Sequence, residues 1–152
     1  MLVIRLAPMC GLLLMIWLSE PVLAQKGGSP KHIDVTATDF AFPDFPATIR
    51  AGLTIFSFIN RGKVTHELSI ARLKSGATLD DFANAKDDPA RRRDLIDRSV
   101  GILIATPGNS PDGRLLADLR KGATYVVFCN LRDKPDAPGH LMFGMYTSFT
   151  PR

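Results

Sequence analysis

The second half of the chain contains two histidines, one cysteine and one methionine in an order that suits the binding of copper. These residues are His66, Cys129, His140 and Met145. Two imidazoles and one thiolate bind copper in a trigonal plane, and a thioether serves as a weak axial ligand. Soft sulfur favours Cu(I), while imidazole suits both oxidation states. The pattern predicts a site for one mononuclear copper ion, and the chemistry of such a site is one-electron transfer.

Other residues of the same types leave alternatives open. Met142 is a second candidate thioether beside Met145. His32 lies near the N-terminus, and we interpret it as a residue that does not bind metal. A single histidine or methionine is more often a surface or core residue than a ligand. The prediction therefore depends on the four residues taken together.

The first 24 residues have the pattern of a secretory signal peptide. Arg5 precedes an apolar run at 10–18, and Val22-Leu23-Ala24 resembles a cleavage site. The run is short for a membrane span, although a retained anchor is the alternative. After cleavage Cys129 is the sole cysteine, so no internal disulfide can form, and burial or a metal must protect the thiol in an oxidising compartment. We expect a periplasmic or secreted protein.

Length and charge indicate one domain and exclude a nucleic-acid partner. The chain has 152 residues and a formal net charge of +4, which removal of Arg5 and Glu20 leaves unchanged. We expect a flexible segment at 25–30 and a single domain at 31–152. The mild positive charge favours an acidic partner. The basic run at 91–93 lies among acidic residues and is interpreted as a solvated helix face.

Short β-branched and aromatic runs separated by turn signals predict an all-β Greek-key sandwich. We expect strands at 31–42, 47–50, 54–60, 65–72, 100–105, 114–119, 123–129 and 141–150. Residues 75–99 break this pattern. Ser75 or Thr78 can cap a helix, and Pro89 suits the first turn of a second helix. These signals predict a short helical insertion packed on the side of the sandwich.

The expected strands bring the four residues toward one end of the sandwich. Cys129 ends a buried strand, and His140 and Met145 follow the loop at 130–139 at the start of the last strand. His66 comes from an earlier strand, with its side chain on the inward face. A strand–loop–strand unit of this kind can place three ligands around one point.

Three segments resemble the cupredoxin family, which includes plastocyanin and azurin. Gly139-His140-Leu-Met-Phe-Gly144-Met145 is similar to the family's His-x4-Met segment. Residues 64–68 (VTHEL) resemble its first-histidine strand, and residues 125–129 (YVVFC) resemble its cysteine strand. The resemblance implies a type 1 copper site with His66, Cys129 and His140 as equatorial ligands and Met145 as the axial ligand.

The chain departs from the family pattern at two places. Ten residues separate Cys129 from His140, so the loop is longer than in small members of the family. Glu67 follows His66 where plastocyanin and azurin commonly carry an asparagine that ties two ligand loops together. Asn60 and Asn130 are candidates for that role.

The resemblance implies a soluble carrier of single electrons between redox partner proteins. His140 would be the exposed ligand, and residues 141–143 would form an apolar docking patch around it. Arg132 and Lys134 would attract an acidic partner. We expect a monomer, with no nucleic-acid partner and no membrane insertion after the leader is removed.

Two other functions stay open, and an enzyme is not expected. The same ligands would serve a copper store or chaperone without redox turnover. The other hypothesis is a metal-free interaction module with a cupredoxin fold. The sequence contains no nucleophile motif or phosphate-binding glycine loop, and only two glutamates. Its three histidines are too few for multicopper catalysis.

Overall fold

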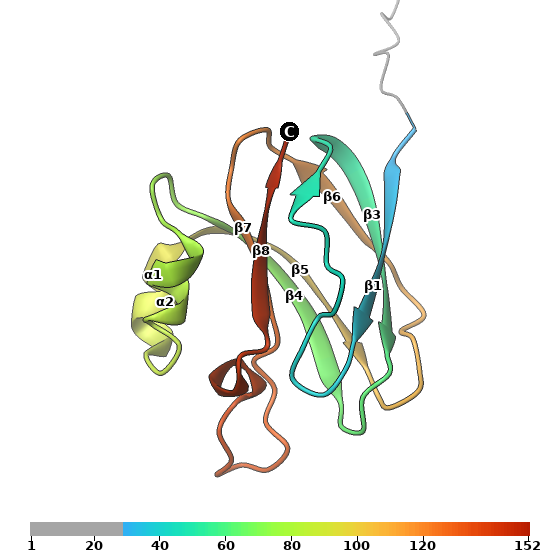
Figure 1. The fold of residues 1–152 in the computed structure, drawn as a ribbon, viewed down its shortest axis with the longest axis vertical. Coiled ribbons are helices and arrows are strands. Elements are labelled where there is room, and N and C mark those ends of the chain that lie inside the picture. The colour runs from blue at the N-terminus through green and yellow to red at the C-terminus, as the bar shows by residue number, and fades with distance from the viewer. Residues whose placement is uncertain (1–28) are drawn as a thin grey trace, which may run out of the picture.

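The structure, a computed structural model, describes residues 29–152 (Figure 1). The predicted leader at 1–24 lies outside the described residues, as do residues 25–28 of the expected flexible segment. Residues 29 and 30 are exposed and precede the first strand. Within residues 29–152, no helix has the length and apolar character needed to cross a membrane.

The described chain forms two β-sheets that pack face to face, as the sequence predicts. The first sheet has the order β1 (Lys31–Ala37), β3 (Gly52–Asn60) and β6 (Leu115–Leu119). The second has the order β2 (Thr48–Ile49), β8 (Tyr146–Pro151), β7 (Tyr125–Phe128), β4 (His66–Leu73) and β5 (Ile96–Ala105). β1 pairs in parallel with β3 and β2 with β8, while the other neighbours are antiparallel.

The main core lies between the sheets and includes two of the predicted ligands. Phe56, Leu68 and Phe149 are almost completely buried there, together with Cys129 and Met145. Alternation along β3 supplies one inward side chain at every second residue. Because two predicted ligands belong to this core, its close packing restricts the movement of their side chains.

A second core lies on the outer face of the five-stranded sheet, beneath the helical insertion. The helices are α1 (Leu79–Ala83) and α2 (Pro89–Leu95), and both lie beside this sheet in Figure 1. The Phe82 ring is fully buried and lies 5.1 Å from that of Phe128 between ring centroids. Cover on both sides explains why nearly all of β4 is buried rather than every second residue.

The capping signals of the insertion act as the sequence predicts, although its end differs. Thr78, and not Ser75, caps α1 through a capping box with Asp81, and Pro89 occupies the first turn of α2. The insertion ends at Leu95 rather than at residue 99, because Ile96 pairs with β4 and begins β5. Residues 97–99 are all exposed, and β5 is an edge strand of the five-stranded sheet, so polar residues there are compatible with a strand.

The first and last expected strands differ most from their predicted ranges. β1 ends at Ala37, and the chain then turns through Phe40, which has φ of 63°. The last strand begins at Tyr146 instead of residue 141, because His140–Phe143 form a short 3-10 helix, η1. Gly144, with φ of 92°, ends η1 in the left-handed region that glycine tolerates best.

Truncation of Phe149 tests the main core. This ring stacks on Tyr125 at 5.1 Å and is 1% exposed. Phe149→Ala is expected to lower the free energy of unfolding of the metal-free protein by about 3–5 kcal/mol, because it removes buried area and leaves a cavity. Urea unfolding measures the change. The exposed Leu116, truncated to alanine as a control, should change stability by less than about 0.5 kcal/mol; equal effects would contradict this core assignment.

Candidate metal centre

Three of the four predicted ligands meet at one end of the sandwich. The Nδ1 atoms of His66 and His140 are 3.1 Å apart. The Cys129 Sγ atom lies 3.3 Å from Nδ1 of His140 and 4.0 Å from Nδ1 of His66. All three side chains are buried, with exposed fractions of 0–1%. These residues form a triangle of donor atoms that are all within 4.8 Å of one another.

The size of the triangle fits one metal ion. With bonds of about 2.0–2.1 Å to nitrogen and about 2.3 Å to sulfur, as for zinc, trigonal ligand atoms lie roughly 3.5–3.8 Å apart. The three separations in the structure lie on both sides of that range. Two nitrogens and one soft sulfur are the equatorial donor set of blue copper sites. The buried group of His66, Cys129 and His140 therefore fits a single type 1 copper ion.

Backbone hydrogen bonds hold the C-terminal ligands together. The Cys129 N–H donates to the carbonyl of Met145 at 3.1 Å, and the Met145 N–H donates to the carbonyl of His140 at 3.3 Å. The His140 N–H in turn donates to the carbonyl of Leu131 at 2.8 Å. Cys129 follows directly on β7, whose pairing with β8 fixes its height in the sheet. The relative positions of the three predicted ligands therefore follow from main-chain pairing.

His66 is positioned by β4 and by the turn that precedes it. Asn60, at the end of β3, is buried, and its side-chain amide donates to the carbonyls of Val64 and Ala105 at 2.7 and 2.9 Å. Its side-chain oxygen accepts the N–H of Gly62 at 2.8 Å. Asn60 therefore fixes the turn that leads into His66. It does not join the two ligand loops, which was the role considered for it.

Glu67 ties the two ligand segments together itself. Its main-chain N–H points at the Cys129 Sγ atom at 3.3 Å. Its carboxylate accepts the N–H of Asn130 at 2.8 Å and the hydroxyl of Ser69 at 3.1 Å. Glu67 is 7% exposed, and its negative charge contributes to raising the pKa of the Cys129 thiol. A carboxylate here performs the linking role for which the sequence suggested Asn60 and Asn130.

The two methionines occupy different surroundings. Met145 is fully buried in the core that contains Cys129, and its main chain bonds to both neighbouring ligands. Met142 is 37% exposed and lines a surface pocket against α2 together with Arg92 and Pro89. Burial and main-chain bonding favour Met145 over Met142 as the axial ligand, which we carry forward as a proposal. His32 is exposed on β1, 3.6 Å from Asp34.

Burial shifts the protonation of two of the donors in the metal-free protein. It raises the pKa of the Cys129 thiol to about 11, which the hydrogen bond from the Glu67 N–H partly opposes. Burial also lowers the pKa of His66 below its usual value, against the opposing hydrogen bond with Asp39. At neutral pH the site therefore contains a neutral His66 and a protonated thiol, which must lose its proton before it can bind a metal.

Each imidazole presents its second nitrogen to a carboxylate. The His140 Nε2 atom lies 3.0 Å from the Asp133 carboxylate, and the His66 Nε2 atom lies 3.5 Å from that of Asp39. Asp133 belongs to the 130–139 loop and Asp39 to the segment that follows β1, and both segments lie at the lower end of the sandwich in Figure 1. A carboxylate at the outer nitrogen fixes the orientation of a ligating imidazole.

The expectation that His140 is an exposed ligand is wrong. Its side chain is only 1% exposed, because the 130–139 loop supplies Asp133 on one side and Phe40 packs edge-on against the ring at 5.1 Å. Phe40 also contacts the His66 ring edge-on at 6.2 Å. Leu141 is buried as well, so it is absent from the expected apolar patch, whereas Phe143 is 53% exposed.

Sequence reasoning missed several residues around the site. Asp39, Phe40 and Asp133 contact the imidazoles from outside the predicted ligand segments. Arg92, interpreted as part of a solvated face, is 8% exposed and donates to the side chain of Asn130 at 3.1 Å. The one signal available in the sequence was Glu67, an isolated acidic residue within an apolar run.

Comparisons with solved structures place this architecture among the cupredoxins. The chain is similar to the dithionite-reduced auracyanin of the photosynthetic bacterium Roseiflexus castenholzii, with a TM-score of 0.55 and 18% identity over 82% of this chain and 99% of that one. Auracyanin B gives a TM-score of 0.55 and 17% identity, over 82% of this chain and 91% of its own. Auracyanin A, a "blue" copper protein of the green thermophilic photosynthetic bacterium Chloroflexus aurantiacus, gives a TM-score of 0.51 and 19% identity, over 81% of this chain and 99% of its own.

The fold is therefore that of the cupredoxins, as the resemblance of the three sequence segments implies. No protein-family model matches the sequence. The comparison with curated proteins gives no match either.

Copper binding is expected to release about one proton per ion at pH 7, because the Cys129 thiol is protonated there and the His66 imidazole is already neutral. The released proton should disappear as the pH rises toward the thiol pKa of about 11. Titration calorimetry in buffers of different ionisation enthalpy measures the proton count. Cys129→Ser should release close to none, and unchanged release in that variant would contradict the assignment of the proton.

A methyl group at Gly62 is expected to disturb the His66 side of the site. A Cβ atom there would lie 2.8 Å from the His66 Nε2 atom and would also collide with the Asp39 carboxylate. Gly62→Ala should therefore weaken copper binding by roughly 10–100-fold, the usual cost of disturbing an outer partner of a ligand. Gly113→Ala is the matched control, because nothing lies within 4 Å of the added atom. Equal copper affinity in both variants would show that the turn does not position His66.

Proposed function

We propose that this protein is a blue copper electron carrier that works outside the cytoplasm. The observation that supports it most directly is the convergence of two imidazole nitrogens and one thiol sulfur in a buried triangle within a cupredoxin fold. We assign His66, Cys129 and His140 as the equatorial ligands and Met145 as the axial ligand. One copper ion bound there would supply the exchange of a single electron between Cu(II) and Cu(I).

The protein residues would keep the donor positions nearly the same in both oxidation states. His66 belongs to a strand that pairs on both sides, with β5 and β7. Cys129, His140 and Met145 are linked by their own main-chain hydrogen bonds. The Glu67 N–H donates toward the sulfur and would stabilise negative charge on it. A site that reorganises little on electron transfer is the main requirement for a rapid carrier.

We propose that electrons enter through aromatic side chains rather than through an exposed imidazole. Phe143 is 53% exposed, and its ring lies 4.7 Å from that of Phe40. Phe40 contacts both ligand rings, so the pair leads from the surface to His66 and His140. Phe143 and the partly exposed Met142 form the remaining apolar patch for a redox partner.

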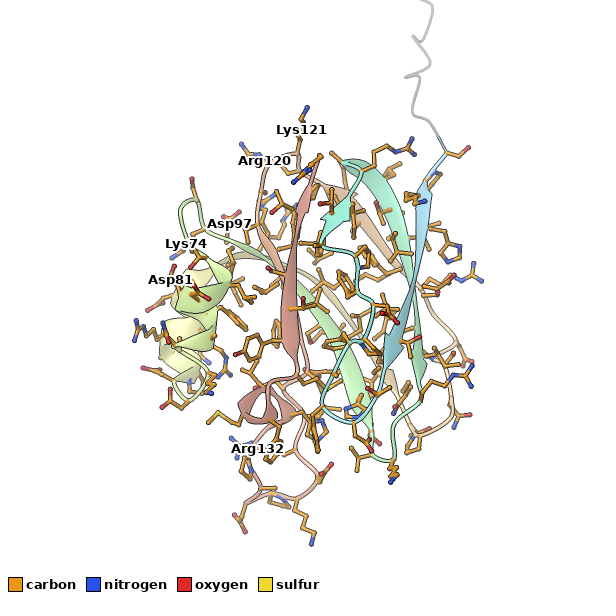
Figure 2. All side chains as sticks on the ribbon, viewed as in Figure 1. Lys74, Asp81, Asp97, Arg120, Lys121 and Arg132 are labelled. Carbon is orange, nitrogen blue, oxygen red and sulfur yellow. The ribbon has the colours of Figure 1, made fainter. Side chains whose placement is uncertain are left out.

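Charge beside this patch favours an acidic partner. Arg132 projects from the end of the molecule that carries the 130–139 loop (Figure 2). Arg132 is exposed, and its guanidinium donates to the carbonyl of Ala137 within the same loop at 3.1 Å. Lys134 is exposed on the same loop. Salt should therefore slow association with an acidic donor or acceptor.

The signal pattern at 1–24 is the support for a periplasmic location. The lone Cys129 is consistent with it, because a thiol that is fully buried and bound to copper is protected in an oxidising compartment. We propose that the mature domain, from residue 25 onward, is exported and meets its redox partners there. Electron transfer, and not catalysis on a substrate, is the activity proposed.

Addition of Cu(II) to the mature protein tests this proposal. We expect an intense visible absorption from the copper–thiolate bond, and an electron spin resonance spectrum with small copper hyperfine splitting. Cys129→Ala should abolish the colour, while His32→Ala should leave it unchanged. Met145→Leu should shift the reduction potential, and Met142→Leu should not.

Other outcomes would select the alternative functions. Tight, colourless binding of Cu(I) without a stable Cu(II) form would indicate a copper store or chaperone. The absence of any copper binding that depends on Cys129 would leave the metal-free interaction module as the function to pursue.

A further inference from the structure

The loop between Cys129 and His140 has a specific contact with one ligand. The Asp133 carboxylate oxygen lies 3.0 Å from Nε2 of His140. The carboxylate side chain is 41% exposed, while the imidazole is 1% exposed. The loop therefore places an anion from the solvent boundary against the outer edge of a buried ligand ring.

The neighbours of the two ring nitrogens bear on which nitrogen of His140 carries the proton. The Nδ1 atom faces the Cys129 sulfur at 3.3 Å and the His66 Nδ1 atom at 3.1 Å, so it needs a free lone pair to bind a metal. A neutral imidazole then has its N–H on Nε2, where Asp133 accepts it. A carboxylate at that position fixes the tautomer and raises the basicity of the coordinating nitrogen.

The loop is held in place at both ends. At its start, the Asn130 N–H donates to Glu67 and the Asn130 side chain accepts from Arg92 of α2. Near its end, the His140 N–H donates to the carbonyl of Leu131 across the loop at 2.8 Å. A Cβ atom at Gly139 would lie 3.4 Å from the Asn130 carbonyl oxygen, so the two ends approach closely. These contacts fix the position from which Asp133 reaches His140.

The corresponding contact at His66 is weaker. Asp39 lies 3.5 Å from Nε2 of His66, and the same oxygen accepts the Lys63 N–H at 2.6 Å. That hydrogen bond to Lys63 is the main reason why the pKa of Asp39 is lowered. Asp133, by contrast, has one side-chain partner among residues 29–152, and that partner is His140.

We propose that Asp133 is a positioning residue that holds His140 in the copper-binding tautomer and favours Cu(II) over Cu(I). The bound site carries one more positive charge in the oxidised form, so a fixed negative charge beside a ligand stabilises that form. The inference rests on the proposed function, because it assigns a role toward the bound copper. The proposal also accounts for the length of the 130–139 loop, since a loop too short to reach past His140 could not place an anion beside its Nε2 atom.

Variants at two positions of the same loop separate this role from a general effect of charge. Asp133→Asn removes the charge but keeps an acceptor oxygen, and Asp133→Ala removes both. Asp136→Asn is the matched control, because Asp136 is exposed on the same loop and has no hydrogen bond or ion pair to residues 29–152. All are made in the mature protein.

The reduction potential and the copper affinity are the readouts for the loaded protein. Asp133→Asn should shift the equilibrium toward Cu(I) by about tenfold, which raises a one-electron potential by about 59 mV. Asp133→Ala should in addition weaken Cu(II) binding by roughly 10–100-fold. Asp136→Asn should change either quantity by less than about threefold at physiological salt, because exposed charges are screened over about 8 Å. Equal shifts in Asp133→Asn and Asp136→Asn would overturn the proposal.

Nitrogen NMR of the metal-free protein tests the contact without copper. We expect the His140 imidazole to carry its proton on Nε2, with slow exchange that becomes rapid in Asp133→Ala and stays slow in Asp136→Asn. Rapid exchange in the unsubstituted protein would overturn the positioning role. A protein that binds no copper but keeps slow exchange of the His140 Nε2 proton would contradict the electron-carrier function and leave the Asp133 contact intact. Failure of the proposed function is therefore distinguishable from failure of the positioning role.

Discussion

The structure depends on one constraint, which is that two imidazole nitrogens and a sulfur must stay close together where water does not reach. Donor atoms 3.1–4.0 Å apart would not remain so in a flexible segment, because each side chain would turn toward solvent. The chain meets the constraint by making Cys129 and Met145 part of the core between the sheets and by beginning β4 at His66. The close packing of that core resists displacement of the donors.

Burial of so many polar groups requires partners for all of them. Among residues 29–152, no buried side-chain nitrogen or oxygen lacks a hydrogen-bond partner. Glu67 illustrates how this is achieved, since its carboxylate accepts hydrogen bonds from Asn130 and Ser69 while its main-chain N–H donates to the Cys129 sulfur. An unpaired carboxylate at this depth would cost several kcal/mol. The polar network around the site is therefore a condition of the fold and also an influence on the chemistry of the thiol.

The sequence predicts the sheets, the insertion and the meeting of three ligands, because these depend on residue type and short-range periodicity. His66, Cys129 and His140 converge as expected, and the capping by Thr78 follows from local hydrogen bonding. Asp133 was beyond prediction, because its contact depends on the path of an irregular loop. The burial of His140 could not be predicted for the same reason. The 3-10 helix at His140–Phe143 was missed because its apolar side chains also suit a strand.

The helical insertion has a physical connection to the metal centre that its position in the sequence does not suggest. The buried Arg92 of α2 donates to the carbonyl of Lys86 and to the side chain of Asn130. Asn130 donates to Glu67, which donates to the Cys129 sulfur. Each bond restricts the group that makes the next one, so the insertion braces the start of the ligand loop from outside the sandwich. A loop of ten residues needs such a brace, because without it the entropy of the free loop would oppose the geometry that brings His140 to Cys129.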